Sequence, residues 1–245
     1  MAMLRLFRYW LLNPRKSKRM EFTPEAYKLI FWDFDGVIKD SVPLKTEAFD
    51  QLFCKYGEDV RKYVREYHLL HGGVSRHIKI PHYFRTLLNQ ELSEEETLEY
   101  CQRYADSVIE GVIACPWIEG AREFLKSNPH DQQHMIVTGT PQDEIEHILE
   151  AIDLVSPFSK IFGAPHTKPE VLAQMLVETK MEPEECLMIG DSMTDHDAAV
   201  ENQVPFLLRE NEENREHFAF FDGPKVLNFL PVSYTHLTLP TSDLV

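Results

Sequence analysis

The sequence predicts an α/β protein with a three-layer core, a parallel sheet covered by helices, and a helical domain inserted after the first strand. Short apolar runs alternate with helical stretches, which favours parallel pairing of the strands with helices on both faces of the sheet. A helical pattern without intervening strands occupies residues 43–114. The length of 245 residues allows one such core with a modest insertion.

Composition and charge exclude several classes of protein. The net charge is −15, although residues 1–20 contain six basic residues and no acidic one. A body this acidic repels nucleic acid, because phosphate contacts need Lys and Arg. No apolar run is long enough to span a membrane. The four cysteines form no C-x-x-C pair and nothing reads as a secretory signal, which favours free thiols in the cytoplasm.

Five short apolar runs are predicted to form the strands of the sheet: residues 27–32, 134–137, 160–162, 186–189 and 204–208. Among the helices, one is expected to begin at a capping box formed by Ser93 and Glu96. Another is expected to begin with Thr140 as N-cap and Pro141 at its first position, and to continue to about residue 153. A further helix is predicted over residues 171–180.

The two ends of the chain differ in composition from the middle. Residues 1–19 either form a basic interfacial anchor or precede a true start at Met20, and we favour the second interpretation. Residues 231–245 (PVSYTHLTLPTSDLV) contain no Lys, Arg or Glu and look like a translated adapter tail, so we expect them to be non-native. The core is therefore expected over residues 20–42 and 115–230.

Polar residues follow three of the predicted strands. Asp33 follows the first strand, Thr138 the second and Asp191 the fourth. Because ligands bind beyond the carboxyl ends of strands in an open parallel sheet, we expect these three side chains to meet at one edge. The sequence therefore predicts a functional site at that edge.

The acidic residues near this edge suit phosphoryl transfer. Asp33 and Asp35 lie one residue apart, so they would repel each other unless a cation lay between them. Together with Asp191 and Asp195 they offer hard oxygen ligands without Cys or His, a set that Mg²⁺ prefers. Once a metal shields the phosphoryl charge, Asp33 can attack phosphorus. Asp35 can protonate the leaving oxygen and later accept a proton from water.

Donor groups complete the expected site. Thr138 and the backbone N–H of Gly139 can donate hydrogen bonds to phosphoryl oxygens, and Lys168 can neutralise the remaining charge. Each motif alone has an ordinary structural explanation, such as a turn, a helix cap or a solvated lysine. Their occurrence in this order, with three of them after predicted strands, favours one shared site.

These motifs in this order resemble the haloacid dehalogenase (HAD) superfamily. The resemblance spans about residues 27–210 and is carried by residues 31–38 (FWDFDGVI), 136–140 (IVTGT), 168–169 (KP) and 189–195 (IGDSMTD). It implies a Rossmann-like core in which Asp33 is the nucleophile and Asp35 the general acid and base. Thr138 and Lys168 would hold the phosphoryl group.

The resemblance also implies a Mg²⁺ site. Asp33 and Asp191 would ligate the ion through their side chains, and Asp35 through its backbone carbonyl. Asp195 looks like a support for this site, although some members use both acids as ligands. The dehalogenase branch lacks the second aspartate of the first motif, so the presence of Asp35 favours phosphoryl transfer over carbon–halogen cleavage.

The helical insertion at residues 43–114 resembles the mobile cap of the family, whose closure would exclude water and select the leaving group. Residues 71–76 (HGGVSR) resemble the substrate-facing loop of phosphoglycolate phosphatase and β-phosphoglucomutase relatives. Arg76 would bind an anionic substrate bidentately, the alternative being a helix-connecting turn with a solvated Arg76. Lys45 stands where β-phosphoglucomutase has a histidine, which weakens a mutase interpretation. Lys45 would pair with Asp35 or touch the substrate.

We therefore predict a cytoplasmic Mg²⁺-dependent phosphatase that hydrolyses a small phosphorylated metabolite through an aspartyl-phosphate, similar to phosphoglycolate phosphatase. One alternative is a sugar-phosphate mutase of the β-phosphoglucomutase type. The other is a catalytically idle scaffold tethered to membranes by its basic N-terminus. We expect no nucleic-acid partner and, apart from such a weak anchor, no membrane binding. The sequence does not indicate the oligomeric state.

Overall fold

The computed structural model describes residues 24–230, so the predictions for residues 1–19 and 231–245 lie outside the described residues. Within this range, six parallel strands form one sheet in the order β3-β2-β1-β4-β5-β6. The strands are β1 (Leu29–Trp32), β2 (Gln133–Pro141), β3 (Phe158–Ala164), β4 (Cys186–Gly190), β5 (Phe206–Arg209) and β6 (Lys225–Val226).

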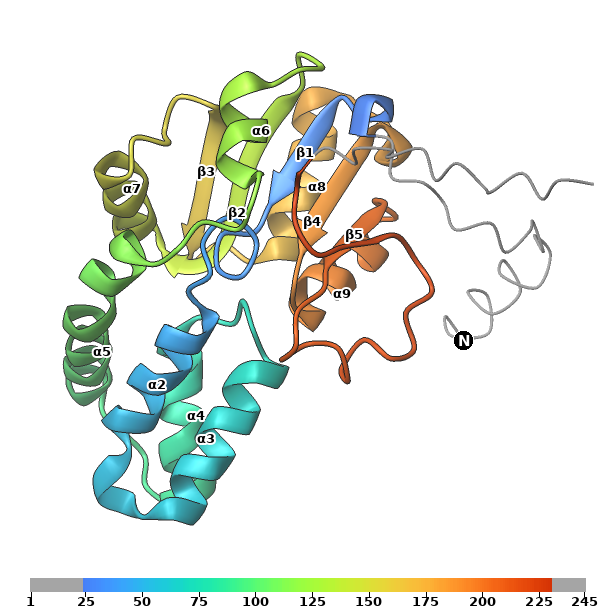
Figure 1. Cartoon of the computed structure of the whole chain (residues 1–245). Coiled ribbons are helices and arrows are strands. Elements are labelled where there is room, and N and C mark those ends of the chain that lie inside the picture. Colours follow the sequence, from blue (N-terminus) through green and yellow to red (C-terminus); the bar gives the residue numbers. More distant parts are fainter. Residues whose placement is uncertain (1–23, 231–245) are drawn as a thin grey trace, which may run out of the picture.

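The α-helices of the described range fall into two groups (Figure 1). Four of them follow β1 directly in the chain and lie together beyond one end of the sheet: α2 (Val42–Leu52), α3 (Glu58–Leu70), α4 (Arg76–Leu88) and α5 (Glu94–Ala114). The others cover the sheet: α6 (Ala121–Ser127), α7 (Gln142–Ala151), α8 (Lys168–Thr179) and α9 (Met193–Glu201). Short 3₁₀ turns occur at η1 (Pro24–Ala26), η2 (Cys54–Tyr56) and η3 (Pro183–Glu185).

The sheet is the middle of three layers, as the alternation along β1 shows. Ile30 and Trp32 belong to a buried cluster with residues of α6 and α7, and this cluster continues into helices α2 to α5. Leu29 and Phe31 point the other way and pack with residues of α8 and α9. Both faces of β1 are therefore buried, which is the reason why this strand reads as a continuous apolar run. The predicted three-layer α/β fold is confirmed.

Strands β1 to β5 correspond to the five predicted runs, with boundaries that differ by up to two residues except at the end of β2, which was predicted four residues too early. β2 continues to Pro141, because its end still pairs with β3, where Pro141 lies opposite Ala164. Thr140 is therefore part of the strand and not a helix N-cap, and α7 begins one residue later than Pro141, at Gln142. β6 contains two residues, too few for an apolar run to reveal.

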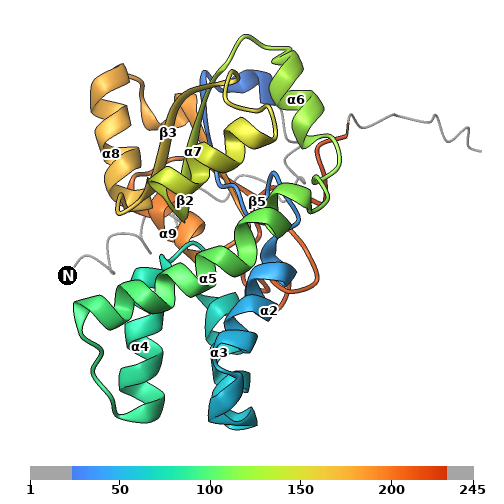
Figure 2. The same cartoon turned by 90° about the vertical axis from the view of Figure 1, so that its left-hand side faces the viewer.

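Helices α2 to α5 lie at the end of the sheet where β1 stops and α2 begins (Figures 1 and 2). The capping box of Ser93 and Glu96 at the start of α5 is confirmed, with both reciprocal hydrogen bonds present. All four cysteines are free. Among residues 24–230, no helix combines the length and the apolar character needed to cross a membrane.

Candidate active site

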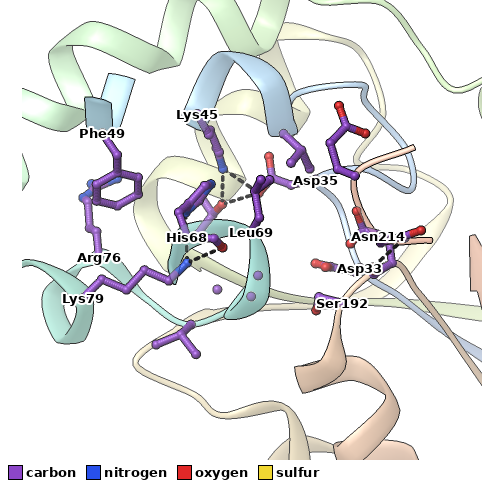
Figure 3. A pocket seen from close by; sticks show the side chains of 18 of the residues that line it. Asp33, Asp35, Lys45, Phe49, His68, Leu69, Arg76, Lys79, Ser192 and Asn214 are labelled. Atoms are coloured by element: carbon purple, nitrogen blue, oxygen red, sulfur yellow. Dashed lines mark hydrogen bonds and ion pairs between the residues drawn. The ribbon is translucent and has the colours of Figure 1, made fainter. Parts of the chain in front are cut away.

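One cavity lies between the carboxyl ends of the central strands and the helices α2 to α5 (Figure 3). Its core wall includes Asp33, Asp35, Gly139, Thr140 and Asp191. The facing side chains come from α2, α3, α4 and α5 and from the loop before α4: Lys45, Phe49, His68, Leu69, Val74, Arg76, Lys79 and Tyr104, together with the backbone of Gly72 and Gly73. The sheet edge that the sequence predicted as a site is thus one wall of a cavity.

Asp33 lies at the point where β1 ends. Its backbone N–H still donates to the carbonyl of Ile189 in β4 at 3.0 Å, so the sheet fixes its position. Its side chain is 4% exposed, and its Oδ2 lies 2.9 Å from Nζ of Lys168. Burial raises the pKa of Asp33, the Lys168 ammonium opposes this, and the nearby Asp195 and Asp35 carboxylates raise it further, to about 7. Burial and the neighbouring acids therefore outweigh the Lys168 ammonium, and Asp33 faces the cavity with a raised pKa.

Lys168, the first residue of α8, bridges two buried carboxylates. Its Nζ contacts both Asp33 and Asp195. Burial would lower the pKa of Lys168, but the two carboxylates together raise it above its ordinary value. Asp195 is fixed in turn, because its Oδ2 accepts hydrogen bonds from the backbone N–H of Ser192 at 3.1 Å and from the Ser192 hydroxyl at 2.5 Å. Both oxygens of Asp195 are therefore engaged by protein groups.

Asp191 follows β4 in a loop that Asn214 holds by donating to the Asp191 carbonyl at 2.8 Å. Within residues 24–230, the Asp191 carboxylate receives no hydrogen bond, and burial together with the Asp33 and Asp195 carboxylates raises its pKa well above the usual value. Ligand oxygens of these three acids lie within 4.8 Å of one another. Gly36 has φ of +74°, and a side chain there would overlap Asp191. This crowded, buried set of hard oxygens fits a divalent cation such as Mg²⁺.

Asp35 points to a different set of partners. Nζ of Lys45 lies 2.5 Å from its Oδ2, and the hydroxyls of Ser41 and Thr140 donate to the carboxylate at 2.5 and 3.2 Å. Burial would raise the pKa of Asp35, but the Lys45 ammonium and these hydrogen bonds hold it below the ordinary value. Of the two roles expected for Lys45, the structure therefore shows the pairing with Asp35.

Thr138 and Lys168 lie beneath the cavity and do not line it. The Thr138 hydroxyl accepts a hydrogen bond from the N–H of Thr140 at 3.3 Å. The loop before α4 covers this region, because a Cβ added to Gly139 would overlap the carbonyl of Gly73, and one added to Gly73 would lie 2.8 Å from Nζ of Lys168. Glycines at both positions thus allow the helical domain to approach the core closely.

Arg76 lines the cavity from the start of α4, but its guanidinium is already occupied. It forms a bidentate ion pair with Glu144 of α7, and it lies over the ring of Tyr104 at 5.4 Å. The fork that the sequence analysis assigned to an anionic substrate therefore joins the helical domain to the core in this structure.

Sequence reasoning missed several residues of the site. Ser41 and Thr140 hold Asp35, and no motif marked either of them for that contact. Lys79 and His68 line the cavity as a hydrogen-bonded pair. One signal for Lys79 was present, since it lies three residues after Arg76 and therefore on the same side of α4.

Comparison with known proteins gives one matching family model and several distant relatives. The model of the haloacid dehalogenase-like hydrolase family matches residues 30–208. A phosphoglycolate phosphatase 1 from Pseudomonas aeruginosa is 27% identical over 189 residues, which cover 71% of this chain and 66% of that protein. The chain thus spans slightly less than two thirds of that relative. A phosphorylated carbohydrates phosphatase from Thermotoga maritima is 26% identical over 180 residues, covering 69% of this chain and 79% of that protein.

Solved structures share the fold. A β-phosphoglucomutase from Clostridium difficile matches with a TM-score of 0.67 at 18% identity, covering 85% of this chain and 94% of that one. A predicted phosphoglycolate phosphatase from Haemophilus somnus matches with a TM-score of 0.58 at 18% identity, covering 75% of this chain and 85% of that one. At these identities the match supports the fold and leaves the substrate open.

Proposed function

Because the chain belongs to the haloacid dehalogenase-like hydrolase family, we propose that it is a Mg²⁺-dependent phosphatase acting on a small phosphorylated metabolite. The observation that carries this proposal is the setting of Asp33, a buried carboxylate on the cavity wall, beside Lys168 and within a group of three acids. The name of the Pseudomonas aeruginosa relative makes phosphoglycolate the first substrate to test.

In the proposed first step, a carboxylate oxygen of Asp33 attacks phosphorus while the bond from phosphorus to the leaving oxygen breaks. For this step Asp35 must first take up a proton, so the contacts that hold it ionised in the present arrangement have to be released when substrate binds. The leaving oxygen then takes that proton from Asp35, so an alcohol departs and an aspartyl-phosphate remains on Asp33. Lys168 stabilises the charge on the transferring group, since its ammonium already contacts Asp33. Thr138 and the N–H of Gly139 are proposed to donate to phosphoryl oxygens once the loop before α4, which contains Gly73, moves away.

In the proposed second step, water attacks phosphorus, the bond to the Asp33 oxygen breaks, and Asp35 accepts the proton. Asp35 must be ionised to act as this base. The contacts from Lys45, Ser41 and Thr140 keep it ionised in the present arrangement, so they favour this step.

Mg²⁺ would neutralise phosphoryl charge and so allow an anionic nucleophile to approach. We propose that Asp33, Asp191 and the carbonyl of Asp35 hold the ion. Asp195 already has both carboxylate oxygens engaged, so we propose that it holds Lys168 and supports the metal site indirectly.

We further propose that residues 43–114 act as a cap over the core at residues 20–42 and 115–230. The close contact of Gly73 with Gly139 supports this, because it covers the phosphoryl-binding residues and would exclude water from the reacting centre. Opening at this contact would admit substrate.

The test is release of inorganic phosphate from a panel of phosphorylated metabolites, with Mg²⁺ and with a chelator. We expect Mg²⁺-dependent turnover that falls at least about 10³-fold in Asp33→Asn, because this substitution removes the nucleophile. Asp40→Asn, an exposed acid in the same loop region, is the matched control and should retain activity. An isomerised sugar phosphate without phosphate release would indicate the mutase alternative. No turnover of any compound would refute the phosphatase.

A further inference from the structure

Lys79 is the most buried cation that lines the cavity. It lies on α4, is 1% exposed, and extends along the cavity wall to place its ammonium beside His68 of α3 (Figure 3). Nζ of Lys79 lies 3.0 Å from Nδ1 of His68 and 3.5 Å from the His68 carbonyl oxygen. Neither residue has a part in the proposed phosphoryl transfer.

The charge of Lys79 lacks a counter-ion. Each of the other cations around the cavity contacts a carboxylate: Lys45 contacts Asp35, Lys168 contacts Asp33 and Asp195, and Arg76 contacts Glu144. No carboxylate in the described part of the chain lies within ion-pair distance of Lys79. Buried charges are normally paired, because removing an unpaired charge from water is costly. The position of Lys79 on the cavity wall indicates that the missing anion enters with a ligand.

His68 does not neutralise this charge. Burial, and then the nearby Lys79 and Lys45 ammonium groups, hold the pKa of His68 well below its usual value, so the imidazole is neutral. A neutral His68 can accept a hydrogen bond from Lys79 at Nδ1 and carry its own proton on Nε2. The ring also packs on Phe49 at 4.8 Å, which fixes its orientation. His68 is therefore suited to orient the ammonium.

The pKa of Lys79 also favours binding of an anionic group. Burial lowers its pKa to about 7, with repulsion from Lys45 and Lys168 adding to the effect and attraction to Asp35 opposing it. An anion bound beside Nζ would restore the charged form of the lysine. Ligand binding would thus be coupled to full protonation of this group.

We propose that Lys79, oriented by His68, binds a second oxyanionic group on the leaving portion of the substrate. This inference rests on the proposed function, in which the phosphoryl group lies at Asp33 and the remainder of the substrate extends toward the cap. It narrows the substrate class to phosphate monoesters that carry a carboxylate or a second phosphate. It also transfers the anion-binding role expected of Arg76 to a residue one helical turn further along α4.

The test is binding of non-hydrolysable phosphonates in the presence of Mg²⁺, measured by calorimetry. Ethylphosphonate carries one anionic group, phosphonoacetate adds a carboxylate, and ethylene-1,2-bisphosphonate adds a second phosphonate. A charge-assisted hydrogen bond predicts that the wild-type protein binds one of the last two about 10- to 100-fold more tightly than ethylphosphonate. Whichever compound shows this preference identifies the second group as carboxylate or phosphate.

Lys79→Met should abolish the preference, while Lys62→Met, at an exposed lysine of α3, should keep it. His68→Leu should reduce the preference, and His68→Asn should restore part of it, because the amide oxygen can accept from Lys79. A wild-type protein without any preference, or a Lys79→Met variant that retains it, would overturn the inference. These results do not depend on turnover, so failure of the phosphatase assay alone refutes the proposed function and leaves the preference as a separate result.

Discussion

The two walls of the cavity carry buried charge in different ways. On the core side Lys168, beneath the cavity, contacts two carboxylates, and across the cavity Lys45 and Arg76 each contact one carboxylate of the core. On the facing wall formed by α2 to α5, here called the cap wall, Lys79 is equally buried, and its partner is a neutral histidine, His68. The charges of the core wall are therefore balanced by protein groups before substrate binds, except for the crowded acids at the proposed metal site. On the cap wall, the charge of Lys79 is balanced only when the proposed anionic ligand binds.

This difference fits a division of labour between the two parts. Phosphoryl transfer needs groups that are positioned before the reaction, because reorganising charge during the reaction raises the barrier. Selection of a leaving group needs a site whose charge is satisfied by the right ligand and left unsatisfied by the wrong one.

The largest effect is expected from removal of Lys168, the cation beneath the cavity that Asp33 and Asp195 share. Lys168→Met leaves Asp33 and Asp195 buried without a counter-charge, so phosphate release should fall about 10²- to 10³-fold, and unfolding should cost about 3 kcal/mol less. Steady-state kinetics and urea denaturation measure the two effects. Lys160→Met, which removes a half-exposed lysine of β3, is the control. Wild-type activity in Lys168→Met would show that the core wall does not need its paired cation.

A second comparison concerns the buried histidines of the two parts. His134 in β2 resembles His68 in being buried and in accepting a hydrogen bond at Nδ1, but its donor is the neutral indole of Trp32 at 3.1 Å. Burial lowers the pKa of His134 from 6.5 to about 4. Its stabilising contribution is therefore complete above pH 6.5 and is lost as the pH falls from 6.5 toward 4, because the unfolded chain binds the proton first.

The lowered pKa of His134 predicts that the unfolding free energy of the protein depends on pH. Between pH 7 and pH 5 the wild-type protein should lose about 2 kcal/mol of unfolding free energy through His134. His134→Gln, which still offers an oxygen to Trp32, should lack that part of the loss. Urea denaturation at both pH values provides the measurement, and the contribution of His68 cancels because both proteins retain it. Equal losses in the two proteins would contradict the assigned pKa.

The sequence was sufficient to predict the core wall because the sheet itself brings its residues together. Parallel strands end at one edge, so residues that follow separate strands, such as Asp33 and Asp191, converge there regardless of the conformation of the loops. Their spacing in the chain needs no knowledge of side-chain packing. The error at Thr140 concerned where β2 ends, and it also places Thr138 within the strand instead of after it, although β1 pairs with β2 only as far as Ile136.

The cap wall could not be predicted in the same way, because it depends on how α3 and α4 pack and how the cap meets the core. His68 and Lys79 come from different helices, and their contact has no signature in the sequence. Arg76 was predicted to bind substrate because the sequence gives its residue type but not its partner. The partner, Glu144, lies 68 residues away on α7, and the sequence around Glu144 gave no indication of this contact.

The contact between Arg76 and Glu144 is a direct link between the two walls. Glu144→Gln keeps the size of the side chain but removes its charge, so closure of the cap should become less favourable by about 1.4 kcal/mol, which corresponds to a roughly tenfold lower kcat/KM. Glu146→Gln, an exposed position on the same helix, is the matched control. An increase in kcat/KM for Glu144→Gln would indicate instead that Glu144 withholds Arg76 from the substrate.

The smallest effect is expected from Lys79, and its sign is opposite to that of Lys168. Lys79→Met removes a buried charge without a counter-ion and leaves Nδ1 of His68 without its donor, so the net result at pH 7 should be a gain in unfolding free energy of about 1 kcal/mol. Because Lys79 has a folded pKa of about 7, below the ordinary lysine value of 10.5, its destabilising contribution grows as the pH falls from 10.5 toward 7. The advantage of the variant should therefore be larger at pH 7 than at pH 9, which urea denaturation at the two pH values would measure. A destabilised Lys79→Met protein would mean that the lysine supports the fold, whereas a more stable protein that has lost its preference for a second anion would place the charge there for binding.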